Sequence, residues 1–395
     1  MVPVRVLMVS GEFPPQHGGL GDYTNLLCEH LAPLGIEVGV VTSKAAGETA
    51  RGKGFPVAPA VNRWDFFCWP ELGKRIRTMH ANVIHVQYQT AAYGLHPAIN
   101  LLPLALRMAK NPAKVVFTFH DLEAPRQPWL RGPARQMAMR AGERKCDAFV
   151  ATNGADFQQL MAAEPGPPWA RYHLIPIGAN VPKRPPPRYQ PQQVRKKLGA
   201  GARTLLLSHF GLLNQSKGLQ DLLVAMKLLL EQGHDVRLTL VGGTTGSSDV
   251  TNVPFANQVR AQIEQLGLSG RVQETGFLSP EEVSAHLLAC DVCVLPYRDG
   301  ASFRRGTLMA ALEHGLCVLT TRPAEADLVD GQNVRLADPG NPIALARVLD
   351  ELADDEVSRR RLGIEAAKLA QRFSWPSIAE KHLALYLDVL EESVG

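Results

Sequence analysis

Residues 295–321 read LPYRDGASFRRGTLMAALEHGLCVLTT, and the predicted architecture of the chain can be built outward from this stretch. It opens with an apolar run, continues through a polar segment and a small-residue run that predicts a helix from about Thr307, and closes with a second apolar run. This order predicts strand, loop, helix and strand. Backbone N–H groups and the positive end of the helix dipole attract an anion where such a loop enters a helix. Arg304 and Arg305 precede that point and Gly306 allows close approach, so we expect a phosphate there.

Length and composition limit the class of protein. A chain of 395 residues exceeds one ordinary hydrophobic core, so two domains of roughly 150 to 200 residues each are expected. With 45% hydrophobic and 20% charged residues, the composition is that of a globular protein. The formal net charge of +4 is small for this length and indicates no nucleic-acid partner.

The cysteines and the N-terminal run indicate a reducing, cytoplasmic environment. Only Cys290 and Cys293 have CxxC spacing, and the pair spans a predicted helix end and a strand, so we expect buried thiols and no metal site. The apolar run at residues 4–10 is short, contains Arg5 and predicts a first strand, not a signal peptide. No apolar stretch is long enough to span a bilayer.

Apolar runs alternate with helical patterns along the whole chain. In the first half the runs are residues 4–10, 38–42, 83–87, 115–120, 148–152 and 173–177, and in the second half they are residues 204–210, 237–241, 272–275, 292–295 and 317–321. Strands that alternate with helices indicate mostly parallel sheets covered on both faces. The chain is therefore predicted to be an α/β protein with two Rossmann-like domains.

Two breaks in this alternation predict the domain boundaries. Residues 182–193, PKRPPPRYQPQQ, hold five prolines and no apolar periodicity, which is typical of a semi-rigid linker. Near the C-terminus, Pro376 interrupts a helical pattern that then resumes. We expect a first domain over residues 1–182, a linker over 183–202, a second domain over 203–375 and a separate final helix over 376–395.

The loops after the predicted strands hold the candidate site residues, because open parallel sheets bind ligands at the carboxyl ends of their strands. The loop after the first strand contains Gly18 and Gly19, which permit positive φ and close approach to a phosphate or sugar, or simply form a tight turn. His120 ends a strand, where it can hydrogen-bond a substrate hydroxyl or be held by backbone carbonyls. In the second domain, Gly211 opens a loop whose Lys217 either contacts phosphate or is an ordinary solvated lysine.

The stretch from Arg126 to Lys145 is basic and has two interpretations. It contains Arg126, Arg131, Arg135, Arg140, Arg144 and Lys145 against a single acid, Glu143. A basic amphipathic helix can lie on an anionic bilayer, which would place the protein peripherally on the inner face of the membrane. The alternative is a solvated helix face with a few core contacts.

Taken together, the motifs resemble those of GT-B glycosyltransferases of the retaining family 4 type, nearly end to end. The segments that carry the resemblance, in the family's order, are EFPPQHGGLGDYTNLLCEHLAPLGIEVGVVTS, TFHD, IPIGANV, FGLLNQSKGLQDLLVAM, LVGG, GFLSPEEVSAHLLACDVCVLP, GLCVLTT and FSWPSIAEKHLALYL. The resemblance implies two Rossmann-like domains with a cleft between them and a final helix that crosses back to the first domain. It also implies transfer of a sugar from a nucleotide diphosphate sugar to a glycan, lipid-linked or small-molecule acceptor, with retention and without a metal or other cofactor.

The resemblance further implies a catalytic pair and a donor-binding set. His120 contacts the transferred sugar, and Lys217 neutralises the leaving diphosphate. The donor contacts come from loop glycines and from backbone amides at the helix start, namely Gly18, Gly19, Gly211, Gly306, Thr307 and Leu308.

The sequence departs from the family at three polar positions. Leu212 stands where the family has an arginine, and Ala301 and Met309 stand where it has two glutamates. One interpretation is that neighbouring residues have taken over these contacts: Arg304 or Arg305 for the arginine, Asp299 for the sugar and Glu313 for the ribose. The other is a catalytically weak relative that serves as a binding protein.

Two other enzyme classes share part of the pattern. Non-hydrolysing nucleotide-sugar epimerases have the two-domain shape, but they need several carboxylates in the crevice and few acids follow the predicted strands. A dinucleotide oxidoreductase is disfavoured because the first loop is not a compact GxGxxG and no acid closes the second strand, VGVVTS. Bound reduced nicotinamide would identify the oxidoreductase.

Overall fold

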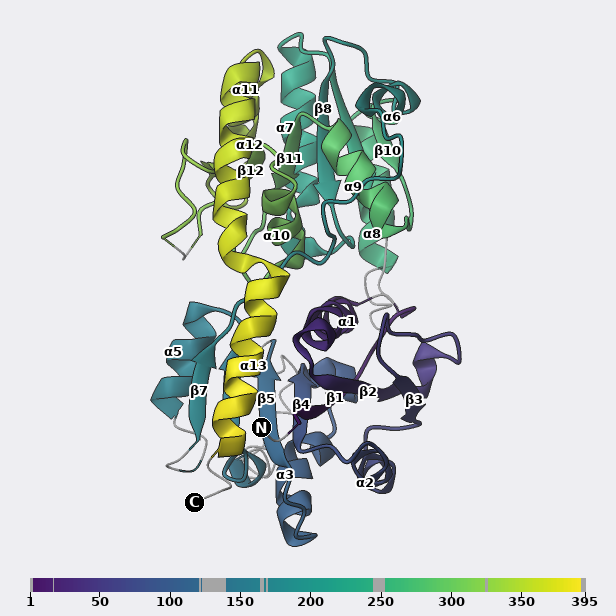
Figure 1. Cartoon of the computed structure of the whole chain (residues 1–395). Coiled ribbons are helices and arrows are strands. Elements are labelled where there is room, and N and C mark those ends of the chain that lie inside the picture. The colour runs from purple at the N-terminus through teal and green to yellow at the C-terminus, as the bar shows by residue number, and fades with distance from the viewer. Residues whose placement is uncertain are drawn as a thin grey trace. The chain divides into compact units, whose positions relative to one another are not determined.

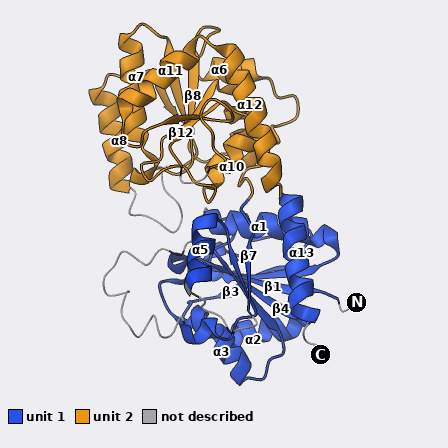
Figure 2. Cartoon of the chain, turned by 90° about the vertical axis from the view of Figure 1, so that its left-hand side faces the viewer, with its two compact units in different colours: residues 1–177, 375–395 blue, residues 178–374 orange. Residues whose placement is uncertain are grey.

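The computed structural model describes residues 3–16, 18–120, 122, 140–163, 167, 170–243, 253–323 and 326–391. The chain divides into two compact units, which Figure 2 shows in different colours. Unit 1 comprises Met1–Ile177 together with Trp375–Gly395, and unit 2 comprises Gly178–Ser374. The C-terminal segment therefore belongs to the first unit, although the whole second unit separates the two in the sequence.

Unit 1 is built on a parallel sheet. Its described residues form seven strands in the order β3-β2-β1-β4-β5-β6-β7. The strands are β1 (Arg5–Ser10), β2 (Glu37–Ser43), β3 (Val57–Val61), β4 (Val83–Tyr88), β5 (Lys114–Phe119), β6 (Ala148–Ala151) and β7 (Arg171–Leu174). Val6 of β1 pairs with Val38 on one side and Val83 on the other. The strand order reverses at β1, and sheets of this kind bind ligands beyond the carboxyl ends of the strands at such a point.

The helices of unit 1 cover a sheet whose central strands are buried on both faces (Figure 1). They are α1 (Gly19–Leu31), α2 (Cys68–Met79), α3 (Ala98–Met108), α5 (Gly154–Ala163) and α13 (Trp375–Glu391), with 3-10 turns at Ala32–Leu34, Lys44–Ala46 and Thr90–Tyr93. The face of β1 that carries Leu7 and Val9 packs against α2 and α3. The C-terminal helix α13, yellow in Figure 1, packs against α1.

Unit 2 repeats this plan with a smaller sheet. Its described residues form six parallel strands in the order β10-β9-β8-β11-β12-β13. The strands are β8 (Leu205–Phe210), β9 (Val236–Val241), β10 (Val272–Glu274), β11 (Val292–Leu295), β12 (Val318–Thr321) and β13 (Arg335–Ala337). Cys293 of β11 pairs with Ser208 of β8 and Val318 of β12. The strand order reverses here at β8, as it does at β1 in unit 1.

The helices of unit 2 follow the strands in the predicted alternation. They are α6 (Pro191–Lys197), α7 (Leu219–Glu231), α8 (Val253–Gln265), α9 (Pro280–Ala289), α10 (Gly306–Glu313), α11 (Pro342–Ala353) and α12 (Glu356–Ala370), with 3-10 turns at Gln215–Lys217 and Gln371–Phe373. Residues 295–321 form the end of β11, a loop, α10 and β12, so the predicted order of elements is confirmed. The α/β class with two parallel sheets and a returning final helix is also confirmed. Within the described ranges, no helix has both the length and the apolarity of a membrane span.

The segment predicted as a linker, residues 183–202, is part of unit 2 and contains a helix. Pro191 occupies the first turn of α6, where its missing N–H costs nothing. Leu198 and Ala200 are buried against Leu206 of β8, and Arg195 donates to the Asp291 carboxylate at 2.9 Å. The proline-rich composition therefore concealed a short helix that packs on the core of unit 2, and the predicted linker bounds stay a prediction.

Two edge strands, β3 and β13, lie outside the predicted runs. β3 contains Pro59, which is tolerated at a sheet edge because no further strand needs its N–H, and β13 has only three residues. Short edge strands have little apolar periodicity, so sequence patterns detect them poorly.

Candidate active site

The start of α10 offers two backbone N–H groups that have no acceptor among the described residues. The N–H groups of Leu308 and Met309 both donate to the carbonyl oxygen of Arg305, at 3.0 and 3.1 Å. The amides of Gly306 and Thr307 therefore remain for a ligand, whereas the amide of Leu308, which was also predicted to contact the donor, already has an acceptor within the chain. A helix start with open amides favours an anion.

Arg305 is held rigidly beside this helix start. Its guanidinium lies 4.2 Å from the centre of the Tyr297 ring and forms an ion pair with Asp299. The Tyr297 hydroxyl in turn hydrogen-bonds Thr307 Oγ1 at 2.8 Å. Since the cation stacks on an aromatic ring and pairs with a carboxylate, it is oriented before any ligand arrives. The structure thus couples Asp299 to Arg305, where the sequence suggested two separate roles.

Lys217 reaches the same place from the loop after β8. Gly211 has φ of 112°, and a Cβ there would overlap Lys217 Nζ and lie 2.8 Å from Thr307 Cγ2. The absence of a side chain at Gly211 therefore makes room for the ammonium group beside α10. Burial, followed by the positive charge of Arg305, lowers the pKa of Lys217 to about 7. Two cations and a helix start converge, and this arrangement can neutralise a diphosphate.

In unit 1, the carboxylate of Glu12 hydrogen-bonds backbone amides of the glycine-rich loop and the helix that follows it. Oε1 of Glu12 accepts hydrogen bonds from the N–H groups of Leu20 and Gly21 at 3.1 and 3.3 Å. A Cβ at Gly18 would overlap this carboxylate, whereas a Cβ at Gly19 meets no atom within 4 Å. Gly18 has φ of −171°, so it does not use the positive φ that glycine permits, and the Glu12 carboxylate occupies the space of a side chain there.

His120 follows β5 directly and lies against two polar residues of unit 1. Its Nε2 lies 2.9 Å from Oε1 of Gln87, and its ring packs edge-on against Tyr23 with centroids 4.6 Å apart. Burial, followed by the positive charge of His382, lowers the pKa of His120 to about 3. The ring is therefore neutral at physiological pH and can hydrogen-bond a sugar without repelling an electron-poor anomeric carbon.

Comparison with known proteins decides the family. A family model described as Glycosyltransferase Family 4 matches residues 17–182, and one described as Glycosyl transferases group 1 matches residues 204–355. A D-inositol 3-phosphate glycosyltransferase from Corynebacterium diphtheriae is 31% identical, over 98% of this chain and 95% of its own. The chain belongs to glycosyltransferase family 4.

Solved structures agree with this family 4 assignment at the level of the fold. Sucrose-phosphate synthase from Thermosynechococcus elongatus has a TM-score of 0.78 at 19% identity, over 98% of this chain and 100% of its own. Anabaena Alr3699/HepE, solved in complex with UDP and glucose, has a TM-score of 0.72 at 19% identity, over 98% of this chain and 99% of its own. The predicted GT-B fold of this glycosyltransferase is confirmed.

In this glycosyltransferase, two of the residues that depart from the family, and one proposed replacement, Glu313, have partners or neighbours within unit 2. Met309 and Ala301 are 1% and 2% exposed, so both side chains are buried. Glu313 lies at the far end of α10, about 10 Å along the helix from Gly306. Its Oε1 accepts a hydrogen bond from the Lys183 N–H at 3.2 Å. This hydrogen bond is within the chain, and the ribose contact of Glu313 stays a prediction.

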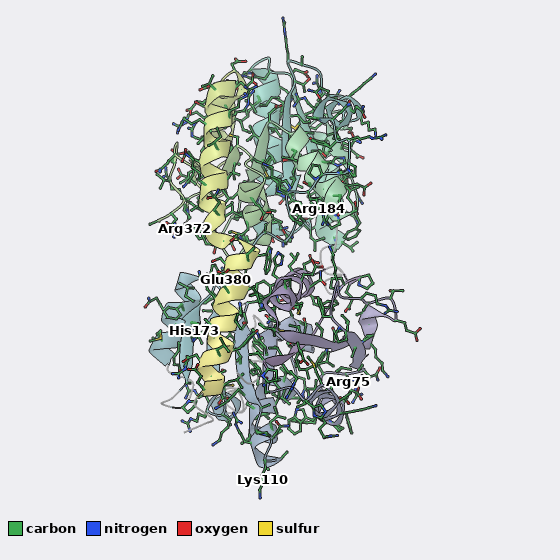
Figure 3. The ribbon with its side chains drawn as sticks, viewed as in Figure 1. Arg75, Lys110, His173, Arg184, Arg372 and Glu380 are labelled. Carbon is green, nitrogen blue, oxygen red and sulfur yellow. The ribbon has the colours of Figure 1, made fainter. Side chains whose placement is uncertain are left out.

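Other cations of the glycosyltransferase lie in ordinary surface pairs. Arg184 and Arg372, labelled in Figure 3, pair with Glu281 at 2.6 Å and Asp327 at 2.7 Å. Such exposed pairs contribute little to stability or to ligand binding. Arg304, the alternative to Arg305, donates its backbone N–H to Ser302 Oγ at 3.4 Å and does not share the Tyr297 ring.

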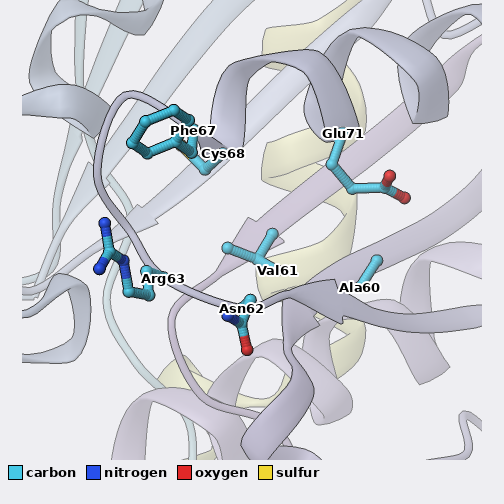
Figure 4. A pocket seen from close by; sticks show the side chains of 7 residues that line it. All are labelled: Ala60, Val61, Asn62, Arg63, Phe67, Cys68 and Glu71. Carbon is cyan, nitrogen blue, oxygen red and sulfur yellow. The ribbon is translucent and has the colours of Figure 1, made fainter.

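Two further features of unit 1 lie outside the candidate active site. Arg126, Arg131 and Arg135 lie outside the described residues, so membrane contact through the basic stretch stays a prediction. A cavity of about 310 Å³ lies beyond β3 and is lined by Ala60, Val61, Asn62, Arg63, Phe67, Cys68 and Glu71 (Figure 4). Arg63 pairs with Asp65 at 2.5 Å and Glu71 with Arg75 at 2.7 Å, so the charges around this cavity are already partnered.

Sequence reasoning missed the residues that orient the predicted ones. Tyr297, Gln87 and Glu12 each hold a predicted site residue. Glu12 and Tyr297 lie inside the quoted segments but were given no role there, and Gln87 lies in none of them. The available signal was the pattern of β4, VIHVQY, in which His85 and Gln87 are polar residues in an otherwise apolar strand. Buried polar side chains need partners, and alternate residues of a strand share one face, so this pattern predicts a polar network.

Proposed function

We propose that the protein is a retaining glycosyltransferase that uses a nucleoside diphosphate hexose and needs no metal ion. The observation that carries this proposal is the convergence of Lys217 and Arg305 on the open amides of Gly306 and Thr307. These groups supply positive charge where a diphosphate leaving group would otherwise need a divalent cation. In a preorganised site, one such donor contributes roughly 3 to 4 kcal/mol to the transition state.

The proposed reaction exchanges one bond at the anomeric carbon for another. The bond from that carbon to the diphosphate oxygen breaks, and the bond to an acceptor hydroxyl oxygen forms on the same face of the sugar. The proton of the acceptor hydroxyl passes to the departing diphosphate. Lys217 and Arg305 stabilise the charge that develops on the diphosphate, while neutral His120 accepts a hydrogen bond from the sugar.

The comparisons suggest which substrates to test first. Anabaena Alr3699/HepE was solved with UDP and glucose, which makes UDP and UDP-glucose the first probes for the donor. The Corynebacterium relative is named for D-inositol 3-phosphate, which makes a phosphorylated polyol the first small acceptor. Glycan and lipid-linked acceptors complete the panel.

A thermal-shift panel of nucleoside diphosphates, run with and without a chelator, tests the proposal. A ligand that binds only the native state stabilises it by about 2.7 kcal/mol at a hundredfold excess over Kd. We expect one nucleoside diphosphate to raise the melting temperature equally in both series, and Lys217→Met to remove most of the shift. Binding that appears only with magnesium or manganese would contradict the metal-free proposal.

A further inference from the structure

A chain of buried polar groups links the C-terminal helix to His120 inside unit 1. Nδ1 of His85 lies 2.7 Å from the hydroxyl of Tyr386 on α13, and Nε2 of His85 lies 2.7 Å from Thr118 Oγ1. The same Nε2 lies 3.3 Å from the amide nitrogen of Gln87, whose Oε1 lies 2.9 Å from Nε2 of His120. His85 and Gln87 are fully buried, so water does not compete for these hydrogen bonds.

The direction of the hydrogen bonds along this chain follows from Met8. The Nε2 atom of Gln87 lies 3.6 Å from the thioether sulfur of Met8 and also faces His85. A thioether can only accept a hydrogen bond, so the NH₂ group of Gln87 faces Met8 and its oxygen faces His120. An amide oxygen can only accept, which requires that Nε2 of His120 carries the hydrogen.

Nδ1 of His120 is therefore a lone-pair acceptor. The low pKa of about 3, caused by burial and then by His382, keeps the ring neutral, so Nδ1 carries no hydrogen at physiological pH. No residue in the described part of the chain hydrogen-bonds this atom. The ring cannot turn freely, because Tyr23 packs edge-on against it at 4.6 Å and Trp375 of α13 lies 5.3 Å from Tyr23.

We propose that Gln87 sets the donor-sugar specificity by holding His120 as a hydrogen-bond acceptor, so that a sugar hydroxyl is accepted and a carboxylate at the same position is rejected. The inference rests on the proposed function, in which His120 contacts the transferred sugar. A hydroxyl donates to the Nδ1 lone pair, whereas an ionised carboxylate has no hydrogen to donate and places its own lone pairs against it. Gln87 is a positioning residue, because it acts on the sugar only through His120.

The tautomer can be measured without any ligand. In protein labelled with ¹⁵N-histidine, the His120 signals are assigned by their loss in His120→Gln. We expect a neutral ring with the hydrogen on Nε2 at pH 7. A hydrogen on Nδ1, or on both nitrogens, would overturn the proposal whatever the donor proves to be, and this experiment needs no Gln87 variant to fold.

The specificity is tested with UDP-glucose and UDP-glucuronic acid, which differ only in a carboxylate in place of a hydroxymethyl group. We expect the wild-type protein to bind UDP-glucose at least about tenfold more tightly, since a buried polar group loses its partner with the other sugar. Gln87→Glu keeps an acceptor beside His120 but adds a negative charge that favours the imidazolium form. In Gln87→Glu the preference for UDP-glucose over UDP-glucuronic acid should therefore fall by about tenfold, while the affinity for UDP alone stays within about twofold of wild type.

Tyr88→Phe is the matched control, because it removes one buried hydroxyl from the next residue of β4 and leaves the chain from Gln87 to His120 intact. Its hydroxyl hydrogen-bonds Asn100 at 3.2 Å and has no contact with that chain. Equal binding of the two sugars by wild type, or an unchanged ratio in Gln87→Glu, overturns the specificity proposal. Failure of UDP itself to bind counts instead against the proposed uridine donor. The tautomer measurement then decides whether Gln87 holds His120 as a hydrogen-bond acceptor.

Discussion

The hydroxyl of Tyr386 lies 2.7 Å from Nδ1 of His85, although 301 residues separate the two along the chain. The contact joins the final helix to the central strand β4, and through Gln87 to the candidate sugar contact His120. The ring of Trp375, the first residue of the same helix, lies 5.3 Å from the ring of Tyr23, which packs edge-on against His120. The returning helix therefore does more than cover the sheet, because it supports the polar interior of unit 1.

Tyr386→Phe should destabilise unit 1 by about 1 to 3 kcal/mol, because Nδ1 of His85 loses its buried hydrogen-bond partner. For a unit of this size that loss lowers the melting temperature by about 2 to 4 °C per kcal/mol. Urea unfolding followed by tryptophan fluorescence measures the change. The affinity for a nucleoside diphosphate, which depends on unit 2, serves as the control and should not move. An unaltered unfolding curve would mean that this hydrogen bond contributes nothing.

The affinity for a nucleoside diphosphate should fall as the pH rises above 7. The free protein holds the pKa of Lys217 at about 7, and the negative charges of a bound diphosphate raise it. At a pH between the pKa values of Lys217 in the free and bound protein, binding takes up a proton. The dissociation constant therefore rises by up to about tenfold per pH unit in this range. Calorimetry in buffers of different ionisation enthalpy measures the proton uptake. In Lys217→Met the affinity should be weaker and independent of pH from 7 to 9, and persistence of the pH dependence there would assign it to another group.

Arg305→Ala should weaken nucleoside diphosphate binding by about 10- to 100-fold, since charge-assisted hydrogen bonds to phosphate are lost. Arg305→Lys should restore little of the lost affinity, because an ammonium cannot stack flat on Tyr297 while it pairs with Asp299. Arg322→Ala provides the control, as this exposed arginine pairs with Asp338 at 2.6 Å on the surface. Equal losses in the two alanine variants would point to a general charge effect.

Comparison of Gly211→Ala with Gly242→Ala separates the effect of backbone strain from the effect of displacing the Lys217 ammonium group. Both glycines have strongly positive φ, 112° and 116°, so each alanine costs about 1 to 3 kcal/mol of stability. A Cβ at Gly211 would also collide with Lys217, whereas the nearest atom to a Cβ at Gly242 lies at 3.5 Å. Melting temperatures should fall in both variants, but nucleotide affinity per folded molecule should fall only in Gly211→Ala. Similar affinity losses in both would show that strain alone explains the result.

Much of the fold and part of the site could be predicted from local patterns. The alternation of apolar and helical runs predicts both sheets, and residues 295–321 predict the loop and helix start where Gly306 and Thr307 offer their amides. Lys217 and Arg305 were recognised because charged residues before a helix are a local signal. These features need only neighbours in the sequence, and for this reason they could be found without coordinates.

The orienting contacts could not be predicted, because their partners are distant in the chain. Tyr386 and His85 lie on different elements, and nothing local indicates that a tyrosine of the final helix reaches β4. Gly18 was predicted to permit a positive φ and close approach, or to form a tight turn, whereas in the structure its φ is −171° and Glu12 occupies the space of a side chain. Glu313 was placed beside the ligand by helical spacing alone, and its hydrogen bond to Lys183 depends on a segment 130 residues away.

The most direct test of the account is the hydrolysis of a nucleotide sugar without metal. NMR spectra recorded from the first minutes identify which anomer of the free sugar is released. The donor is UDP-α-glucose, the first probe under the proposed function, or the α-linked sugar of whichever nucleoside diphosphate binds best, with water as the acceptor and a chelator present. The account predicts that the α anomer of the free sugar appears first, together with the nucleoside diphosphate, and that Lys217→Met abolishes both. The β anomer appearing first, or turnover only after magnesium is added, would contradict it.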